Sequence, residues 1–364
     1  MPSIAHVGLD VHKETTRAVI LPHDEPHPVD ECTVATTQQA LVQYLRRWAQ
    51  VFDLHCYYEA GPCGYEPKRW LAGAGIACDA IAPSKTPRAP GERVITDKRA
   101  ARILAYQGRA QALARVQVPT PAQEAVRAAV RCREVRVRDL VAAKHRVLKL
   151  WRNRGHVFRE GKQHWTQLHW RWLRSRDFEG PDEWTAQQYL SDVQYRQDRL
   201  AEADRVIAEL AEQEPYRSMV GKLCCFRGID VLSAMVLITE TLDFRRFPGA
   251  PQFMGYWGLT SSEDSTGRYR RQGAITKAGS ARARRVWIEA AWHYQHQPAL
   301  GAALSRRQLG QPPEVIAHAW KAQQHLYRKF WRIASRKDKR IAVVAVAREL
   351  AGFVWAAMTQ FECD

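Results

Sequence analysis

Short apolar, β-rich runs alternate with segments of helical spacing over residues 1–118. The strand-like runs are bounded by turn residues, and they read IAHVGLDV, RAVIL, ECTVAT, LHCYYEA and IACDAIAP. Between two of them, Leu41, Leu45 and Trp48 lie four and three positions apart, which is the spacing of one helix face. Another helix is expected to begin near residue 96, capped by Thr96 or Asp97. Strands interleaved with helices predict an α/β domain.

Residues 119–215 have a helical pattern. No glycine or proline interrupts the chain between Pro121 and Gly155. Farther along, a heptad seam with one polar position consists of Tyr189, Val193, Arg196, Leu200, Ala203, Ile207 and Leu210. This spacing predicts either a helical hairpin or a short dimeric coiled coil.

Residues 216–364 are expected to be mainly helical. Two strongly amphipathic or buried helices are predicted over residues 315–333 and 341–358. A tight turn at Arg227-Gly228 separates two apolar segments. Such a turn either offers backbone N–H groups to a phosphate or is an ordinary connection between helices.

The charge of the chain narrows the classes of partner. The 364 residues carry a net charge of +17, with a pI of about 9.7, so a polyanion is the expected partner. We find no run near the roughly 18 apolar residues that a membrane helix needs, and the N-terminus lacks a signal-peptide layout. The eight cysteines show neither zinc-ligand nor redox spacing, so reduced thiols in a cytosolic protein are expected. Nucleic acid is therefore favoured over a membrane surface.

The positive charge is concentrated in one part of the chain. Residues 127–176 contain fifteen Lys and Arg against three Asp and Glu. Contacts with a nucleic-acid backbone are predicted for a group of its basic residues, namely Arg152, Arg154, Lys162, Arg171 and Arg174. Near the N-terminus, Lys13 either contacts a phosphate or is simply solvated.

Three acids fall at the ends of predicted elements. Asp10 and Glu59 each follow a strand-like run, and Asp97 opens a predicted helix. Carboxylates from separate elements suit Mg²⁺, and a basic protein with such a site is suited to phosphoryl transfer on nucleic acid. The alternative is that these acids are ordinary turn and cap residues.

A second candidate site lies in residues 255–285. Ser265 and Thr266 precede Gly267 in a segment rich in cations, which are Arg268, Arg270, Arg271, Lys277, Arg282, Arg284 and Arg285. A hydroxyl beside fixed guanidinium groups can attack a phosphodiester, because those groups stabilise charge on the transferring phosphate. The alternative is a surface loop that only binds the phosphate backbone.

Five segments, in order, resemble one known family. They read VGLDVHKETT, YYEAGPCGY, ITDKRAARILA, CFRGIDVLSAMVLITE and GLTSSEDSTGRYRRQGAITKAGSARARR. Together they resemble the DEDD transposases of the insertion-sequence one-ten family, also called bridge-RNA-guided recombinases, which are related to the pilin-gene inverting invertases. Each segment alone is a weak signal, whereas the combination is specific and extends over nearly the whole chain.

The resemblance implies a fold and a domain order. Residues 1–118 would form a RuvC-like domain of the RNase H fold, and residues 119–215 a helical coiled-coil region for dimerisation and RNA binding. Residues 216–364 would form a mainly α transposase domain that carries a serine nucleophile. Homodimers would pair into a tetramer in the cytoplasm of a bacterium, associated with the nucleoid.

The resemblance also implies a reaction. Four acids of the family hold Mg²⁺, and Asp10, Glu59 and Asp97 match the first three. The serine would form a covalent phosphoserine link to DNA, and a noncoding bridge RNA would pair with donor and target DNA to set specificity.

The sequence departs from the family pattern at two places. Ala100 occupies the position of the fourth acid, three residues after Asp97 and on the same helix face. Its presence implies weakened metal binding and impaired cleavage, through either an engineered change or natural decay. The family commonly has Ser-Ser-Gly where this chain has Ser265-Thr266-Gly267, so the nucleophile is either Ser265, which we favour, or Thr266.

Two other functions remain open from sequence. A RuvC-type, metal-dependent, structure-specific nuclease would cleave without a covalent intermediate and would not need the hydroxyl-rich segment. A noncatalytic nucleic-acid-binding scaffold would bind with strong salt dependence and would not cleave.

Overall fold

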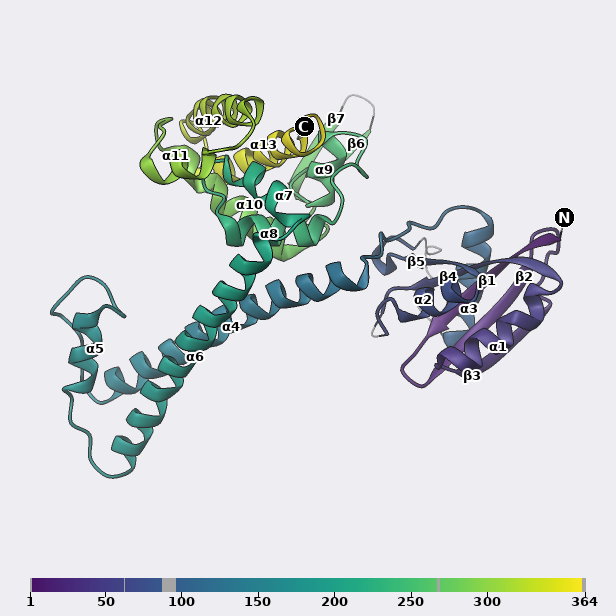
Figure 1. The fold of residues 1–364 in the computed structure, drawn as a ribbon, viewed down its shortest axis with the longest axis horizontal. Coiled ribbons are helices and arrows are strands. Elements are labelled where there is room, and N and C mark those ends of the chain that lie inside the picture. The colour runs from purple at the N-terminus through teal and green to yellow at the C-terminus, as the bar shows by residue number, and fades with distance from the viewer. Residues whose placement is uncertain (1, 62, 87–95, 267–268, 362–364) are drawn as a thin grey trace. The chain divides into compact units, whose positions relative to one another are not determined.

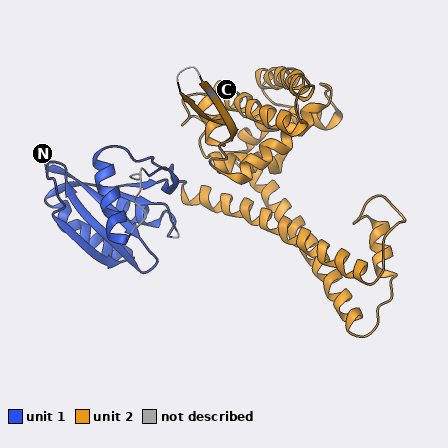
Figure 2. Ribbon diagram, turned by 180° about the vertical axis from the view of Figure 1, so that it is seen from behind, with its two compact units in different colours: residues 1–119 blue, residues 120–364 orange. Residues whose placement is uncertain are grey.

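The chain folds into two compact units, Met1–Pro119 and Thr120–Asp364 (Figure 2). The computed structural model describes residues 2–61, 63–86, 96–266 and 269–361, without the side chain of Arg270. Each unit has its own hydrophobic core and is described separately.

The first unit alternates strands and helices, as the hydrophobic pattern predicts. Its elements are β1 (Ser3–Val11), β2 (Thr15–Pro22), β3 (Asp30–Ala35), α1 (Gln38–Ala49), β4 (Phe52–Glu59), α2 (Glu66–Gly73), β5 (Ala77–Ile81), the short 3₁₀ helix η1 (Pro83–Lys85) and α3 (Asp97–Arg109). The five strands form one sheet in the order β3-β2-β1-β4-β5 (Figure 1). Strands β1, β2 and β3 are antiparallel neighbours, whereas β4 and β5 run parallel to β1.

Helices cover both faces of this sheet. Ala5, Val7 and Leu9 of β1 point to the face that packs against α1 and α2. The opposite face packs against α3, where Val19 and Leu21 of β2 are buried with Ala101 and Ala105 of the helix. Because alternate residues of a strand point to opposite faces, Gly8 of β1 lies beneath α3.

Gly8 permits a very close approach between strand and helix. A Cβ atom at this position would lie 1.8 Å from the backbone oxygen of Ala101 and 2.7 Å from the backbone nitrogen of Ala105. No side chain tolerates such distances, so only glycine allows α3 to sit this close to the central strand.

The second unit begins with two long helices. Its elements are α4 (Pro121–Asn153), α5 (Gln167–Arg174), α6 (Pro181–Ala211), α7 (Tyr216–Cys224), α8 (Val231–Thr241), α9 (Ala250–Tyr256), β6 (Ser261–Thr266), β7 (Tyr269–Ile275), α10 (Ala281–Trp292), the 3₁₀ helix η2 (His293–Gln295), α11 (Ala302–Gln308), α12 (Pro313–Ala334) and α13 (Lys339–Thr359). The helix predicted from Pro121 starts with a capping box between Thr120 and Gln123.

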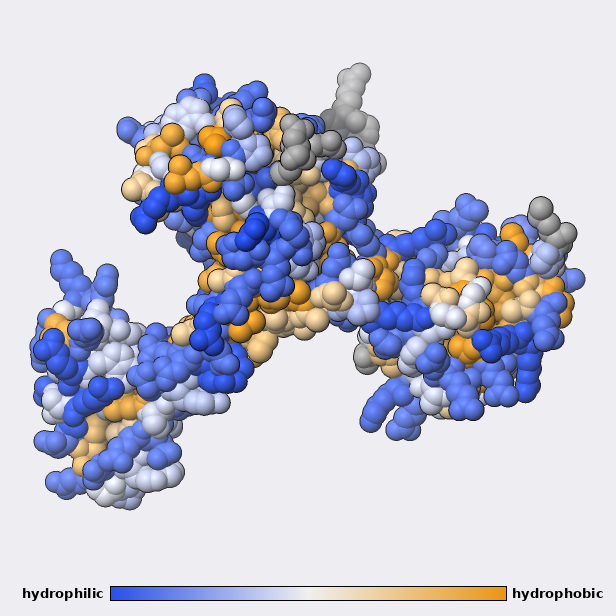
Figure 3. Space-filling model, in the orientation of Figure 1, coloured by the Kyte–Doolittle hydropathy of each residue, from blue (hydrophilic) through white to orange (hydrophobic). Residues whose placement is uncertain are grey.

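Helices α4 and α6 form an antiparallel hairpin within one chain, which is one of the two arrangements that the heptad seam predicts (Figure 1). Val193 and Ile207 of the seam are buried. The polar seam residue, Arg196, pairs with Asp139 of α4 at 3.5 Å and with Asp192 of its own helix at 2.8 Å. Hydrophilic residues cover most of the face of this hairpin seen in Figure 3.

The C-terminal helices enclose the largest core of the molecule. Among the described residues, one helix, α13, is long and apolar enough to cross a membrane by length and composition, which our sequence analysis did not anticipate. Its buried side chains, including Val346, Leu350 and Val354, pack in this core, and the helix contacts α9, α10 and α12. Such burial is typical of the central helix of a folded domain.

The Arg227-Gly228 turn between α7 and α8 is packed internally. A Cβ at Gly228, which has a φ of 85°, would lie 2.6 Å from the backbone oxygen of Ala290. Asp230 caps α8 by accepting a hydrogen bond from the N–H of Ser233. The turn therefore serves a close helix contact, and a side chain already engages the first turn of α8.

An ion pair with a buried carboxylate joins α4 to α8. The Arg131 guanidinium donates two hydrogen bonds to the Glu240 carboxylate, from Nε at 2.7 Å and from Nη2 at 3.0 Å. The Glu240 side chain is only 6% exposed. Burial alone would raise its pKa, but the hydrogen bonds and charge of Arg131 outweigh burial and hold the pKa below its ordinary value of 4.5.

We predict that Gly8→Ala destabilises the first unit by about 3 kcal/mol or more, because the new methyl group would force α3 away from β1. Urea unfolding followed by circular dichroism measures this change. Gly73→Ala is the matched control, since no atom lies within 4 Å of its added Cβ. Equal stability of the two variants would contradict the close approach.

We predict that Glu240→Gln lowers the unfolding free energy at neutral pH by about 2 kcal/mol. The folded-state pKa of Glu240 is lowered, so its contribution is present above the ordinary value and is lost as the pH falls through the folded value. The destabilisation should therefore shrink in acid. Glu289→Gln, which removes an exposed pair with Arg285, is the control and should change little. A Glu240→Gln effect that is independent of pH would contradict the assignment.

Candidate active site

Two acids lie on the same face and at the same edge of the sheet. Asp10 is two residues beyond Gly8 on β1, and Glu59 is two residues beyond Tyr57 on β4, so both point to the α3 side. The strands are parallel, and Leu9 pairs with Tyr58. The two carboxylates therefore end neighbouring strands at one level, as their positions after strand-like runs predict.

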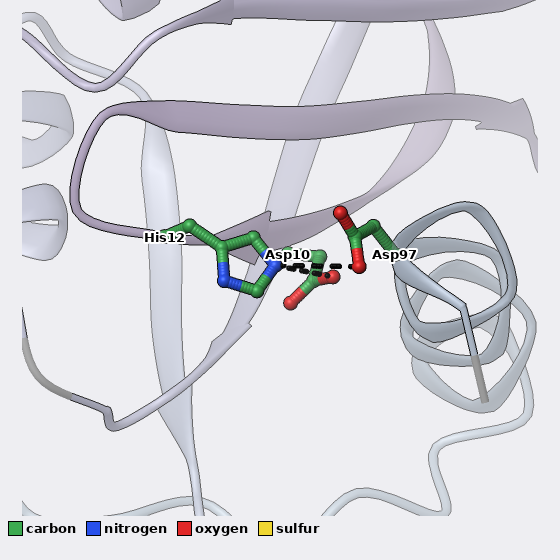
Figure 4. A group of neighbouring side chains, drawn as sticks. All are labelled: Asp10, His12 and Asp97. Atoms are coloured by element: carbon green, nitrogen blue, oxygen red, sulfur yellow. Dashed lines mark hydrogen bonds and ion pairs between the residues drawn. The ribbon is translucent and has the colours of Figure 1, made fainter.

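The third acid comes from the helix that covers this face. Asp97 is the first residue of α3, and the Thr96 side chain caps that helix by accepting a hydrogen bond from the Arg99 N–H. Potential ligand atoms of Asp10, His12 and Asp97 all lie within 4.8 Å of one another (Figure 4). The close contact of α3 with Gly8 thus brings the start of the helix to the end of the strand.

His12 is a member of this cluster that sequence reasoning missed. Its Nε2 atom lies 3.2 Å from Asp10 Oδ2 and 3.6 Å from Asp97 Oδ1, and Figure 4 shows its ring directed at both carboxylates. The available signal was its place two residues after Asp10, just beyond the strand. A neutral imidazole can ligate a metal, and a protonated one can neutralise the two acids.

Glu59 and Ala100 complete the surroundings. Glu59 Oε1 accepts a hydrogen bond of 2.7 Å from the Thr86 hydroxyl, and Glu59 is not part of the 4.8 Å cluster. Ala100 lies one helical turn after Asp97, is half-buried and supplies only a methyl group. Within the described ranges, the structure thus brings Asp10 and Asp97 together and places Glu59 on the adjacent strand.

Asp10 and Glu59 at the edge of the sheet and Asp97 at the start of α3 form what we call the carboxylate edge. Its electrostatics favour a bound cation. Burial raises the pKa of Asp10, and the negative charges of Asp97 and Glu59 raise it further, while His12 opposes the shift. A divalent cation at this point would offset the repulsion, and the carboxylate oxygens of Asp10, Asp97 and Glu59 suit it.

The described part of the second candidate site is a pair of strands, β6 and β7, while Gly267 and Arg268 between them lie outside the described residues. Strands β6 and β7 pair in antiparallel register, with Ser265 opposite Arg270 and Thr266 opposite Tyr269. The described side chains of β6 are all exposed. These strands lack an alternating apolar face, so no period-two hydrophobic pattern marks them in the sequence.

The hairpin distinguishes the two candidate hydroxyls. The Ser265 hydroxyl donates to Glu263 Oε1 at 3.0 Å, and Gln272 Nε2 donates to Glu263 Oε2 at 3.3 Å. Since successive strand residues alternate between faces, Ser265, Glu263 and Gln272 share one face, and Thr266 lies on the other.

The cations predicted near the hairpin fall into three groups. Arg268 lies outside the described residues, as does the side chain of Arg270, while Arg271 and Lys277 are exposed. Arg284 donates to the backbone oxygens of Trp257 and Ala278. Arg282 and Arg285 both pair with Glu134 of α4, Arg285 at 3.2 Å. Arg282, Arg284 and Arg285 therefore make contacts within the fold that stabilise it.

The cations predicted in the first part of the chain and in the helical hairpin are mostly exposed. Arg152, Lys162 and Arg171 are exposed, as is Lys13 in the turn after β1. Arg174 lies over the ring of Trp170 at 5.1 Å. Arg154 forms a two-armed pair with Asp182, at 2.5 and 2.8 Å, so part of its donor capacity is already used.

Known proteins match the chain along almost its whole length. A family model for the DEDD transposases of IS110 matches residues 7–153, and one described as "Transposase IS116/IS110/IS902 family" matches residues 222–304. The chain is 34% identical over 362 residues to a protein of Sinorhizobium fredii named "Putative transposase y4qE", covering 97% of this chain and 88% of that protein. It is 31% identical over 339 residues to the "Transposase for insertion sequence element IS1533" of Leptospira borgpetersenii, covering 92% of this chain and 98% of that one.

The first family model spans the strand ends that carry Asp10 and Glu59 and the helix that carries Asp97. The second spans the hairpin that carries Ser265. Both candidate sites thus lie within matched segments, and the relatives extend over both units. The chain belongs to the IS110 family of insertion-sequence transposases, proteins that cut and rejoin DNA.

Proposed function

We propose that this transposase cuts and rejoins DNA through a covalent phosphoserine intermediate, with Mg²⁺ held at the carboxylate edge of an RNase H-like first unit. The observation that carries the metal part is the convergence of Asp10 and Asp97, with Glu59 on the neighbouring strand. The sheet order, with an antiparallel β1-β2-β3 and parallel β4 and β5, supports the RNase H-like assignment.

The residues of the edge have defined tasks in this proposal. Asp10, Asp97 and Glu59 would hold the ion through carboxylate oxygens, and the ion would supply charge stabilisation for the transferring phosphate. His12, which lies against both Asp10 and Asp97, would fix their orientation. Ala100 offers no ligand, so this chain would bind the ion weakly and cleave slowly.

The serine step conserves the number of phosphodiester bonds. The Ser265 hydroxyl gives its proton to Glu263 while its oxygen attacks the phosphorus. The bond from phosphorus to one sugar oxygen breaks, and that oxygen leaves as a hydroxyl after it takes a proton. Rejoining reverses the step with a hydroxyl of another strand, so no free energy source is required.

Ser265 fits the nucleophilic role better than Thr266. Its hydroxyl already donates to a carboxylate, which is the arrangement of an activated nucleophile with a general base. A primary hydroxyl is also less hindered than the β-branched hydroxyl of threonine.

The proposal includes the partners that the family resemblance implies. Donor and target DNA would be paired by a bridge RNA, and the exposed cations Arg152, Lys162 and Arg171 near α5 would contact its backbone. Homodimers would pair into a tetramer, at the nucleoid in the bacterial cytoplasm. The basic surface of the α4–α6 region supports the RNA contact.

We predict that Ala100→Asp tightens Mg²⁺ binding at least about tenfold, which corresponds to about 1.4 kcal/mol. The new carboxylate would share the helix face of Asp97. Calorimetric titration measures the dissociation constant, and Asp10→Asn in the same background should abolish the gain. Ala100→Asn is the matched control, having the same size without the charge. Equal affinities of the Asp and Asn variants would contradict the proposal.

We predict that Ser265→Ala reduces covalent adduct formation on the order of a thousandfold or more in the Ala100→Asp background. Thr266→Val should retain the adduct, because its side chain lies on the other hairpin face. A labelled DNA junction, Mg²⁺ and the RNA of the element are supplied, and the denaturant-resistant band is mapped by peptide mass spectrometry.

The other outcomes of this assay identify other functions. Cleaved DNA without an adduct would favour a metal-dependent nuclease. Attachment at Thr266 would move the nucleophile by one residue. Binding without cleavage or adduct in the acid-restored protein would favour a nucleic-acid-binding scaffold.

A further inference from the structure

The end of α12, the turn that follows and the start of α13 are strongly basic. Residues 328–340 contain seven Lys and Arg and a single acid, Asp338. The hydrophobic pattern predicts a helix up to residue 333, where charges alternate with core positions such as Phe330, and another helix from residue 341, but it assigns no role to the charges. In the structure four of these cations, Lys329, Arg332, Arg336 and Lys337, line one groove.

A groove lies between this segment and β7. Its volume is about 510 Å³, and its lining residues include Arg332, Arg336, Lys337, Ile341, Arg348 and Gln272. We call it the basic groove. Its lining also contains apolar Ile341, which is 53% exposed.

Most of the positive charge of the basic groove is not compensated within the chain. Glu349 pairs with two of the cations that line the groove, Lys329 and Arg348, the latter at 3.8 Å, and with His325 at 2.8 Å. Asp338 caps α13 and pairs with Arg340. For three exposed cations, Arg332, Arg336 and Lys337, there is no ion-pair partner in the described parts of the chain.

The basic groove is continuous with the hairpin face that carries Ser265. Gln272 lines the groove and donates to Glu263, and the same carboxylate accepts the hydrogen bond from Ser265. The Ser265 hydroxyl is therefore linked through Glu263 to Gln272, which lines the same groove as the uncompensated cations. All these residues belong to the second unit.

We propose that the basic groove binds the phosphate backbone of the DNA strand that Ser265 attacks. Three cations without an ion-pair partner among the described residues, beside the apolar lining residue Ile341, suit phosphates and the sugars between them. RNA carries the same phosphodiester chemistry, but the connection to the Ser265 face favours the reacting DNA. The choice of DNA strand rests on the proposed function, whereas the phosphate site itself rests on charge and geometry.

The test compares two triple variants with equal changes in charge. The groove variant removes the three uncompensated cations of the basic groove by changing Arg332→Gln, Arg336→Gln and Lys337→Gln together. The matched control changes exposed cations of the same two helices that do not line it, Lys321, Arg328 and Lys339, to glutamine. Fluorescence anisotropy measures the affinity of the full chain for a labelled DNA duplex and for an RNA of equal length over a range of salt concentrations.

The groove variant should bind DNA at least about tenfold more weakly at low salt, and its log–log salt slope should fall by roughly 2–3 more than that of the control. Equal losses in the two triple variants would overturn the proposal. Loss confined to RNA would also overturn it. The assay measures binding alone, so a failure of the covalent step does not affect this result.

A measurement on the unaltered chain guards against misfolding of the variants. DNA should protect Lys337 from acetylation, detected by mass spectrometry, while leaving Lys321 reactive. Equal modification of Lys337 with and without DNA would contradict the proposal, whatever the variants do.

Discussion

The contact of α3 with the central strand at Gly8 is the constraint on which the carboxylate edge depends. Without a side chain at Gly8, the helix backbone reaches the strand, and Asp97 at the start of α3 comes within ligand distance of Asp10. The same sheet face carries Glu59 on the parallel neighbour. A local steric condition thus determines whether acids distant in sequence can act on one ion.

The second unit depends on a different kind of constraint. Its long helix α4 is attached to the C-terminal core by buried or half-buried charges, with Arg131 on Glu240 and Glu134 beneath Arg282 and Arg285. At least one arginine of the basic segment 127–176, Arg131, therefore stabilises the fold. Among the described residues, the exposed cations Arg332, Arg336 and Lys337 of the basic groove and Arg152, Lys162 and Arg171 near α5 have no ion-pair partner, so they are better placed to meet phosphates.

Most of the fold could be predicted from the spacing of hydrophobic residues, the turn residues and the helix caps. Short β-rich runs bounded by turn residues predicted β1 and β4, and the Thr96 cap predicted α3, so Asp10, Glu59 and Asp97 could be expected at element ends. The hairpin around Ser265 could not be predicted, because its strands lack a buried face. His12 and the basic groove were missed since they depend on spatial neighbours, which one-dimensional patterns do not encode.

The central claim is that the carboxylate edge of the first unit and Ser265 of the second serve one reaction. The most direct measurement is the amount of DNA attached to Ser265 in Ala100→Asp protein with and without Asp10→Asn, under identical Mg²⁺, RNA and DNA. The account predicts that losing Asp10 removes the adduct although Ser265 is intact. An undiminished adduct would show that the serine works without the edge and would contradict the account.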